Sequence, residues 1–286
     1  MTSAVATQTR NLPLLVTPSL AAGRTYIVTG ANTGLGFEAS KHLATLGAGK
    51  VILAVRNPAA GDIAKQEIDT AAGTAGTSVV EVWPLDMASY DSVRAFVRRV
   101  DAELERVDAV VLNAAVAQAK REMAEGHLLS VTVNVLSTIL LATLLLPVVK
   151  RKAAEGAMPR LVMVASRAGF DSKEDWRGSR GILYGPTKLA ETLAVRHLAR
   201  ELVPADKTGV IINLVCPGLC VTNLARNAPQ DFTEKLREMH AKFGRTAEDG
   251  SRTLLHGVVA GVESHGKLLH SCEDGEYVAP SNLALG

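Results

Sequence analysis

The amino-acid sequence predicts a single-domain α/β protein with one doubly wound parallel sheet, helices on both faces and a C-terminal helical lid. Three observations support this. Short apolar runs rich in β-branched residues alternate with segments of helical periodicity, as in doubly wound sheets. The runs themselves show little alternation of polar and apolar residues, which is typical of parallel strands buried on both faces. In addition, the first run is followed by a cluster of glycines that leads directly into a helix.

The expected elements follow one another in that alternating order. The strands are predicted at Thr25–Thr29, Lys50–Ala54, Val79–Trp83, Ala109–Leu112, Leu161–Ala165 and Val210–Val215. The helices between them are predicted at Leu35–Leu46, Ala59–Ala71, Ser89–Glu105, Met123–Val149 and Leu183–Leu202. Beyond the sixth strand the pattern changes to helices at Asp231–Phe243 and Ala247–Gly261, with a late strand at Glu276–Val278. We therefore expect an N-terminal arm over residues 1–20 and one catalytic domain over residues 21–286, with a lid near residues 219–245.

Composition excludes several classes of protein. The 286 residues are 47% hydrophobic and 21% charged, with a net charge of +2, which describes a folded protein without the basic surface that binds nucleic acid. Three cysteines cannot form a disulfide framework, and they favour a reducing, cytoplasmic location. The longest apolar run, Val135–Val149, is short for a membrane span. The seven histidines are scattered, so no metal site is predicted.

The glycine cluster is the most informative motif. Gly30, Gly34 and Gly36 stand in a G-x-x-x-G-x-G spacing, on the turn where the first strand feeds a helix. There a dinucleotide pyrophosphate can rest against backbone N–H groups and the positive end of the helix, and glycine lets the phosphates approach closely. The expected cofactor contacts come from Gly30, Asn32, Thr33, Gly34, Leu35 and Gly36. Taken alone, the cluster is also compatible with an ordinary turn.

Further cofactor contacts are expected where the next strands end. Arg56, followed by Asn57, occupies the place where an acidic residue would bind ribose hydroxyls, and arginine can instead pair with a 2′-phosphate. This favours NADP over NAD, although a solvated surface arginine is the alternative. Asp86, followed by Met87, could hydrogen-bond adenine or equally cap the helix that starts near Ser89.

The fourth strand ends in a polar residue with small neighbours. Asn113 is followed by Ala114 and Ala115, which suits a backbone that lies close to a cofactor. The alternative interpretation is an asparagine that serves only to shape the loop.

Three residues suggest acid–base chemistry. Tyr184 and Lys188 are four residues apart, so they share one helix face, and Ser166 follows the fifth strand. An adjacent ammonium and a cationic nicotinamide would lower the pKa of the phenol, which could then exchange a proton with a substrate oxygen. The serine would hydrogen-bond that oxygen. Because Pro186 is tolerated only in a first turn, the helix is expected to start close to Tyr184.

With these motifs the chain resembles the short-chain dehydrogenase/reductase family, most closely its retinol-dehydrogenase and protochlorophyllide-reductase-like branch and the related fungal reductases. The resemblance covers roughly Arg24 to Leu224 and implies a Rossmann-like fold. It rests on the glycine turn, Asp86, Asn113-Ala114-Ala115, the set Ser166, Tyr184 and Lys188, and Cys216-Pro217-Gly218 followed by Thr222.

The resemblance also implies roles for individual residues. Tyr184 would be the acid/base, Lys188 would hold the nicotinamide ribose, and Ser166 would orient the substrate carbonyl. Asn134 matches the family asparagine that supports a water-linked proton path to the lysine. The matches to the segment that contacts the nicotinamide are Pro217, Gly218 and Thr222. The chain departs from the common pattern at Ala115, at Ala165 and in the apolar surroundings of Asn134, but no triad member is replaced.

The resulting hypothesis is an NADP(H)-dependent oxidoreductase that interconverts a carbonyl and a secondary alcohol on an apolar small molecule. The apolar preference is inferred from the expected lid, which contains Leu219, Val221, Leu224, Phe232, Leu236, Met239 and Phe243. These side chains could instead only pack the lid. A non-redox isomerase or cyclase and a non-catalytic NADP sensor are the alternative functions. The polar segment Asp171–Arg180, with Trp176, is a candidate wall of the substrate mouth.

The resemblance also bears on assembly. Family members commonly pair through two matching helices, which here are Val135–Val149 and Leu183–Leu202, as a homodimer or a homotetramer. The apolar character of the first helix fits such an interface, and burial within one chain explains it equally well.

Overall fold

The described strands form one parallel sheet of seven strands. The structure is a computed structural model that describes residues 5, 7–118, 120–170 and 183–273. The strand order across the sheet is β3-β2-β1-β4-β7-β8-β9, and every neighbouring pair is parallel. The strands are β1 (Thr25–Thr29), β2 (Lys50–Val55), β3 (Val80–Pro84), β4 (Ala109–Leu112), β7 (Arg160–Val164), β8 (Ile211–Cys216) and β9 (Leu268–His270). The chain leaves β1 in one direction and returns to place β4 on its other side, so a crevice opens between their carboxyl ends.

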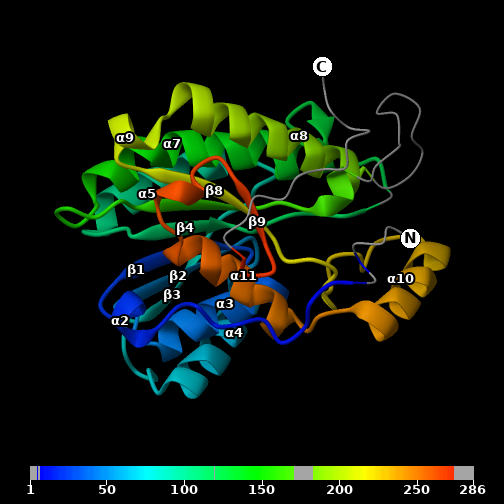
Figure 1. Cartoon of the computed structure of the whole chain (residues 1–286), viewed down its shortest axis with the longest axis horizontal. Helices are drawn as coiled ribbons and strands as arrows, with labels where there is room; N and C mark the ends of the chain where they lie inside the picture. The colour runs from blue at the N-terminus through cyan, green and yellow to red at the C-terminus, as the bar shows by residue number, and fades with distance from the viewer. Residues whose placement is uncertain (1–4, 6, 119, 171–182, 274–286) are drawn as a thin grey trace.

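Helices cover both faces of the sheet, as Figure 1 shows. One face carries α3 (Gly34–Thr45), α4 (Pro58–Ala72) and α11 (Ala247–Val259), and the other carries α5 (Tyr90–Glu103), α7 (Thr138–Arg151) and α8 (Tyr184–His197). Each face buries its own apolar cluster, as expected for strands that are apolar on both sides. The doubly wound parallel sheet and its two helical layers are therefore confirmed.

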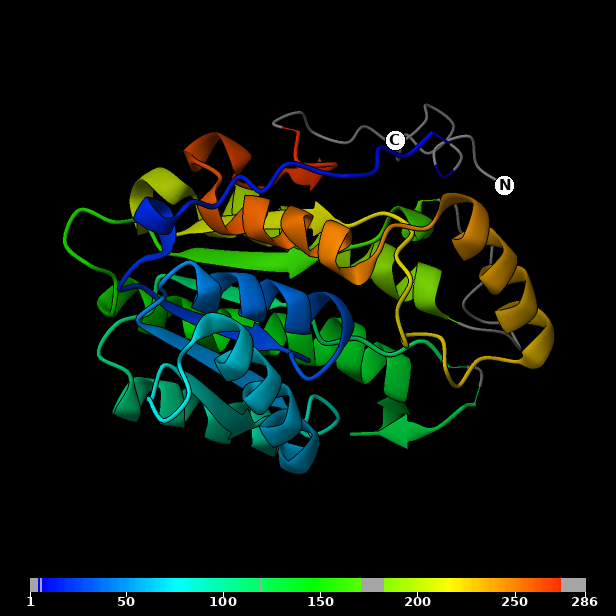
Figure 2. The ribbon, with the colours of Figure 1, turned by 90° about the horizontal axis from the view of Figure 1, so that it is seen from below.

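The remaining helices, strands and turns connect these layers or lie beyond them. They are α2 (Pro18–Ala21), the strands β5 (Met123–Ala124) and β6 (His127–Leu128), α6 (Leu129–Val131), α9 (Ala205–Thr208), α10 (Gln230–Phe243), the 3-10 turns η2 (Arg167–Gly169) and η4 (Val262–Ser264), and the π-helical turns η1 (Thr132–Ser137) and η3 (Leu198–Leu202). In both ribbon views, α10 lies beyond the carboxyl ends of the strands (Figures 1 and 2).

The six expected strands agree with the structure to within one residue at each end, but two other expectations need comment. The helix predicted over Met123–Val149 is wrong at its start, because β5 and β6 form a hairpin there. The hairpin turns through Glu125 and Gly126, both at positive φ, and the helix begins only at Leu129. The strand predicted at Glu276–Val278 lies outside the described residues, and the seventh strand is instead β9.

One helical segment is as long and as apolar as a membrane-spanning helix. Leu129–Arg151 forms a run of 23 helical residues that is long and apolar enough, by length and composition, to cross a membrane. The run is longer than the predicted fifteen apolar residues because α6, η1 and α7 are continuous. However, 56% of its most apolar window is buried inside the molecule. Leu141, Leu145 and Val149 are fully buried in the core, so the segment serves as a core helix of the sheet.

Candidate active site

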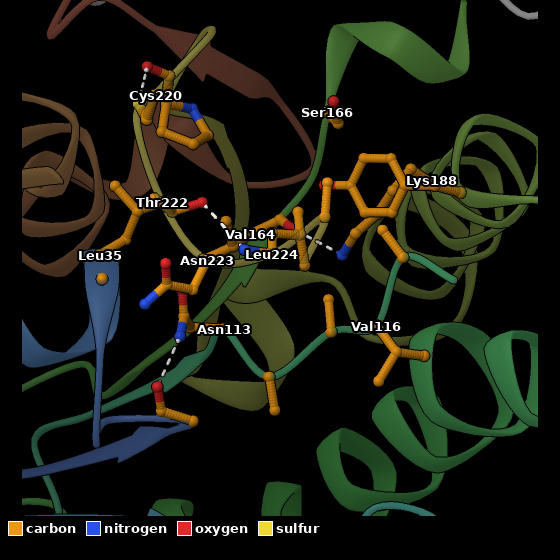
Figure 3. Close-up of a pocket in the computed structure, with 18 of the residues that line it drawn as sticks. Leu35, Asn113, Val116, Val164, Ser166, Lys188, Cys220, Thr222, Asn223 and Leu224 are labelled. Atoms are coloured by element: carbon orange, nitrogen blue, oxygen red, sulfur yellow. Dashed lines mark hydrogen bonds between the residues drawn. The ribbon is translucent and has the colours of Figure 1, made fainter. Parts of the chain in front are cut away.

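A cavity of about 950 Å³ lies at the carboxyl ends of the strands. The loops after β1, β2, β3, β4, β7 and β8 line it, together with one face of α8 and one face of α10. Most of the predicted site residues line this one cavity, as Figure 3 shows for some of them. They are Gly30, Asn32, Thr33, Gly34, Leu35, Arg56, Asp86, Met87, Asn113, Ala114, Ala115, Ser166, Tyr184, Lys188, Pro217, Gly218 and Thr222. Gly36, Asn57 and Asn134 lie outside the cavity wall and have other contacts.

The glycine turn has the geometry of a phosphate cradle. Gly30 has a φ of +66°, and a Cβ there would lie 3.1 Å from the Cα of Ala114. Gly34 has a φ of +62° and opens α3, the helix whose N-terminus faces the cavity. A Cβ on Gly36 would come within 2.6 Å of the Asn113 side chain. The first two glycines therefore shape the turn, while Gly36 permits close packing beneath it.

Asn113 ties the end of β4 to the end of β1. Its Nδ2 donates to the carbonyl oxygen of Thr29 at 2.9 Å, and the Thr29 hydroxyl accepts from the backbone N–H groups of Asn113 and Ala114, both at 2.9 Å. These bonds fix the two strand ends that flank the crevice. Asn113 therefore holds the loop of Ala114 and Ala115 against the glycine turn, and its contact with a cofactor stays a prediction.

Of the residues expected to contact the adenosine part of the cofactor, some line the cavity and one caps a helix. Arg56 is exposed at the end of β2 and lines the cavity. Asn57 does not line it, because its Oδ1 accepts from the N–H of Ala60 and caps α4. Asp86 lines the cavity, and its Oδ1 accepts from the N–H of Ala88 at 2.9 Å. The cap of α5 is Ser89, so the interpretation of Asp86 as that helix cap is wrong.

Ser166 and Tyr184 meet at the opposite end of the cavity. Ser166 follows β7 and caps the short turn η2, while Tyr184 is the first residue of α8, as the position of Pro186 predicts. Burial raises the pKa of the Tyr184 phenol, and the neighbouring Glu191 carboxylate adds to this rise. The Lys188 ammonium and a side-chain hydrogen bond with Ser166 act in the opposite direction but do not outweigh burial. The phenol is therefore protonated at neutral pH.

Lys188 lies one helical turn below Tyr184 and is only 2% exposed. Its Nζ donates to the carbonyl oxygen of Val164 at 2.7 Å and to Oε2 of Glu191 at 2.7 Å. Figure 3 shows the bond to Val164, which joins α8 to the end of β7. The amine is thus held by one backbone carbonyl and one carboxylate, at the floor of the cavity.

Asn134 acts from behind the cavity wall. It is fully buried on the π-helical turn η1. Its Oδ1 accepts from the N–H of Val116 at 2.8 Å, and its Nδ2 donates to the carbonyl oxygen of Val116 at 2.9 Å and to the hydroxyl of Thr187 at 3.0 Å. The side chain therefore joins the loop after β4 to the first turn of α8. A proton path through this residue remains a prediction.

The segment after β8 is fastened to the N-terminal arm. Gly218 has a φ of +79°, and a Cβ there would collide with Gln8 and Arg245. Gln8 accepts from the N–H of Leu219 at 2.9 Å and donates to the carbonyl oxygens of Leu219 and Phe243. Arg245, which is 1% exposed, donates to the carbonyl oxygens of Thr9 and Pro217, both at 2.7 Å. The described part of the arm thus holds the cavity wall that contains Pro217 and Gly218.

The helix α10 contributes an apolar stripe to the wall of the cavity. Phe232, Leu236 and Met239 line the cavity from one face of this helix, whereas none of its residues is buried. Phe232 is exposed and Leu236 and Met239 are half-buried, so the apolar preference inferred from this stripe stays a prediction. The polar segment Asp171–Arg180 with Trp176, expected to form another wall, lies outside the described residues.

Two groups of candidate functional residues were not predicted from the sequence. Glu191 could have been found, because an acidic residue three positions after a lysine on a helix shares its face. Gln8 and Arg245 gave no such indication, since both bind backbone groups that lie between 28 and 236 positions away along the chain. Across the described ranges, no group of three or more potential ligand side chains is placed to hold a metal ion.

Comparison with known proteins places these features in a family. The family model for short chain dehydrogenases matches residues 24–232. A short chain dehydrogenase/reductase of Cryptosporiopsis is 41% identical over 272 residues, covering 88% of this chain and 82% of that protein. One from Aspergillus flavipes is 40% identical over 266 residues, covering 86% and 76%. Among solved structures, the Pseudomonas aeruginosa RhlG/NADP active-site complex superposes with a TM-score of 0.68 at 22% identity, covering 87% of this chain and 94% of that one.

Proposed function

This chain belongs to the short-chain dehydrogenase family, and on that premise we propose that it is an NADP(H)-dependent oxidoreductase that interconverts a carbonyl and a secondary alcohol on an apolar small molecule, acting as a ketoreductase. One observation carries the proposal. A single cavity has a glycine cradle at a helix N-terminus on one side and Ser166, Tyr184 and Lys188 on the other. That combination suits a dinucleotide and an acid–base reaction in the same space.

The residues at the cradle fit a dinucleotide. A side chain at Gly30 would fill the space beside Ala114, and the N-terminus of the twelve-residue helix α3 favours the negative charge of a pyrophosphate. Arg56 at the end of β2 is placed to pair with a 2′-phosphate, which is the reason for preferring NADP. Asp86 at the end of β3 would accept a hydrogen bond from the adenine amino group. The NADP complex of RhlG fits this assignment as a structural neighbour.

The bound nicotinamide would supply the hydride for reduction or accept it in oxidation. The chain supplies the other groups. Tyr184 donates its phenolic proton to the oxygen of the carbonyl as that oxygen gains negative charge. The Ser166 hydroxyl donates a hydrogen bond to the same oxygen and orients it. The Lys188 ammonium favours the phenolate that remains after the transfer, because it lies within one helical turn of Tyr184.

The substrate class follows from the wall opposite the catalytic groups. Phe232, Leu236 and Met239 line the cavity from α10, where Phe232 is exposed and the other two are only half-buried. Covering such a surface with the apolar body of a substrate removes it from water and contributes to binding. We therefore assign an apolar ketone or secondary alcohol to this end of the cavity, with α10 as its lid.

Purified protein mixed with NADPH and a panel of apolar ketones tests the proposal, with nicotinamide absorbance as the measurement. We expect consumption of NADPH with at least one ketone, and weaker activity when NADH replaces it. Tight nucleotide binding without turnover of any ketone would contradict the proposal and favour a nucleotide sensor. Conversion of a substrate without net change in the nicotinamide would favour an isomerase or a cyclase.

A further inference from the structure

We propose that Glu191 is the counter-ion that keeps the Lys188 ammonium charged and fixed in its place. Glu191 is a positioning residue in this proposal, because it acts only through Lys188. Its effect on catalysis rests on the proposed function, whereas its effect on the charge of Lys188 does not.

The geometry of the pair supports this role. Oε2 of Glu191 lies 2.7 Å from Nζ of Lys188, a distance typical of a charge-assisted hydrogen bond. Both side chains are almost completely inaccessible to solvent, at 2% for the lysine and 1% for the glutamate. The other partner of the amine is the neutral carbonyl oxygen of Val164. In the part of the chain that the structure describes, Glu191 is therefore the carboxylate that neutralises this ammonium.

The second carboxylate oxygen also indicates a function. Oε1 of Glu191 is buried and has no hydrogen-bond partner among the described residues. A buried polar atom without a partner is unfavourable, so an apolar residue of similar volume would be better accommodated if packing were the only requirement. A negative charge beside a buried lysine gives a reason for retaining the glutamate.

Glu191 is the main group that opposes the effect of burial on the pKa of Lys188. The groups whose electrostatic effect reaches Lys188 are Glu191, Tyr184 on the same helix and Cys216 at the end of β8. Burial lowers the pKa of Lys188, and these groups, with Glu191 foremost, more than offset it, so that this pKa is raised overall. Burial also raises the pKa of Glu191, while the Lys188 ammonium and its hydrogen bond lower it. The 2.7 Å contact between Nζ and Oε2 is the geometry of a charged pair. Without Glu191, burial would be opposed mainly by a phenol and a thiol. Buried lysines in such apolar settings lose their proton near neutral pH.

The charge of Lys188 can be measured directly in the cofactor-free protein. Lysine labelled with ¹³C at Cε reports deprotonation through its chemical shift, and Lys188→Met assigns the signal. In the unmodified protein we expect Lys188 to remain an ammonium at pH 8 and above. In Glu191→Gln its titration midpoint is expected to fall by about two pH units or more. Glu201→Gln, the same change at an exposed position of η3, is the control and is expected to leave the midpoint unchanged.

Kinetics provide a second readout that a purely structural role would not change. If Glu191 holds the charge, the loss of kcat/KM in Glu191→Gln is small at acidic pH and grows as pH rises, because Lys188 then loses its proton. A loss by the same factor at every pH, or an unshifted lysine midpoint, would overturn the proposal. Glu191→Met provides the same tests should the glutamine variant not fold. A Lys188 that is already neutral at pH 8 in the unmodified protein contradicts the proposal without any variant.

The proposed function and the counter-ion role of Glu191 can be tested separately. Unmodified protein that reduces no ketone contradicts the proposed function and leaves the lysine titration to decide on Glu191. If the unmodified protein is active but Glu191→Gln leaves the titration midpoint of Lys188 unchanged, only the counter-ion proposal is contradicted.

Discussion

Tyr184 shows how burial decides the state of a single reactive group. Its pKa is raised because burial outweighs the opposing effects of Lys188 and Ser166. A phenol in this state is a proton donor at neutral pH, which suits reduction of a carbonyl. The motif alone suggested a lowered pKa, since the spacing reveals the lysine but not the depth of the site. The positions of Ser166, Tyr184 and Lys188 could thus be predicted, whereas their electrostatic balance could not.

The state of Tyr184 leads to a prediction for pH dependence. Reduction requires the protonated phenol, so kcat/KM for the ketone should be nearly constant across neutral pH and fall only as alkaline pH removes the proton. A pH series of NADPH consumption at limiting ketone measures it. An optimum on the acidic side with a decline through pH 7 would contradict a phenol whose pKa is raised.

Arg56 carries the assignment of the cofactor. Replacing it in Arg56→Ala removes the charge-assisted hydrogen bonds expected with a 2′-phosphate, which are worth about 1.5–3 kcal/mol, and kcat/KM for NADPH should fall about 10- to 100-fold. The value for NADH should change little, because NADH lacks that phosphate. Arg94→Ala, an exposed arginine on α5, is the control. An equal loss of kcat/KM with NADPH and NADH would mean that Arg56 does not bind the 2′-phosphate.

Among the secondary-structure elements, the ends of the strands could be predicted from the sequence. The hydrogen bonds between segments far apart in the chain could not. Asn57 was expected to contact the cofactor, and the structure shows it as the cap of α4. The hairpin at β5 and β6 depends on a Glu-Gly turn that lies within an apolar periodic segment, so periodicity concealed it. The N-terminal arm contacts a segment more than 200 residues away, and no local pattern encodes such a contact.

The fastening of the arm gives a testable result for stability. Arg245→Met would leave the buried carbonyl oxygen of Pro217 and the partly buried carbonyl oxygen of Thr9 without this donor. We expect a loss of about 3 kcal/mol in the free energy of unfolding, with a higher KM for the nucleotide because the wall at Pro217 loosens. Thermal unfolding and nucleotide titration measure the two effects. Arg237→Met, at an exposed position of α10, should change neither. An Arg245→Met protein as stable as its parent would show that the arm is not held this way.

At the level of the whole molecule, the parallel sheet follows from patterns that recur along the chain. Apolar strands with little alternation are typical of burial on both faces, and they predict a parallel sheet covered by helices on both sides. The last strand, β9, is only three residues long, and it follows a helix and a short turn, so it lacks the length that made the other strands recognisable. Its neighbour β8 supplies the pairing that makes it a strand.

The outer face of α7 leads to a prediction about assembly. Ile139, Leu140 and Leu144 on this helix are only partly buried, and Leu193 on the neighbouring α8 is 38% exposed. We expect two copies of the chain to pair across these helices, because pairing would remove these apolar side chains from water. Light scattering should give the mass of two or four chains, and Leu144→Glu should lower it. A single-chain mass for the unmodified protein at micromolar concentration would rule out this pairing.

The central claim is that Tyr184 delivers the proton while a ketone is reduced, and Tyr184→Phe tests it most directly. With the ketone that the unmodified protein reduces best, turnover of NADPH should fall by a factor of about 10² to 10⁴, because the proton donor is lost. Affinity for NADPH should stay nearly unchanged, and Tyr90→Phe, outside the cavity, should behave like the parent. Turnover by Tyr184→Phe at the rate of the unmodified protein would contradict the account.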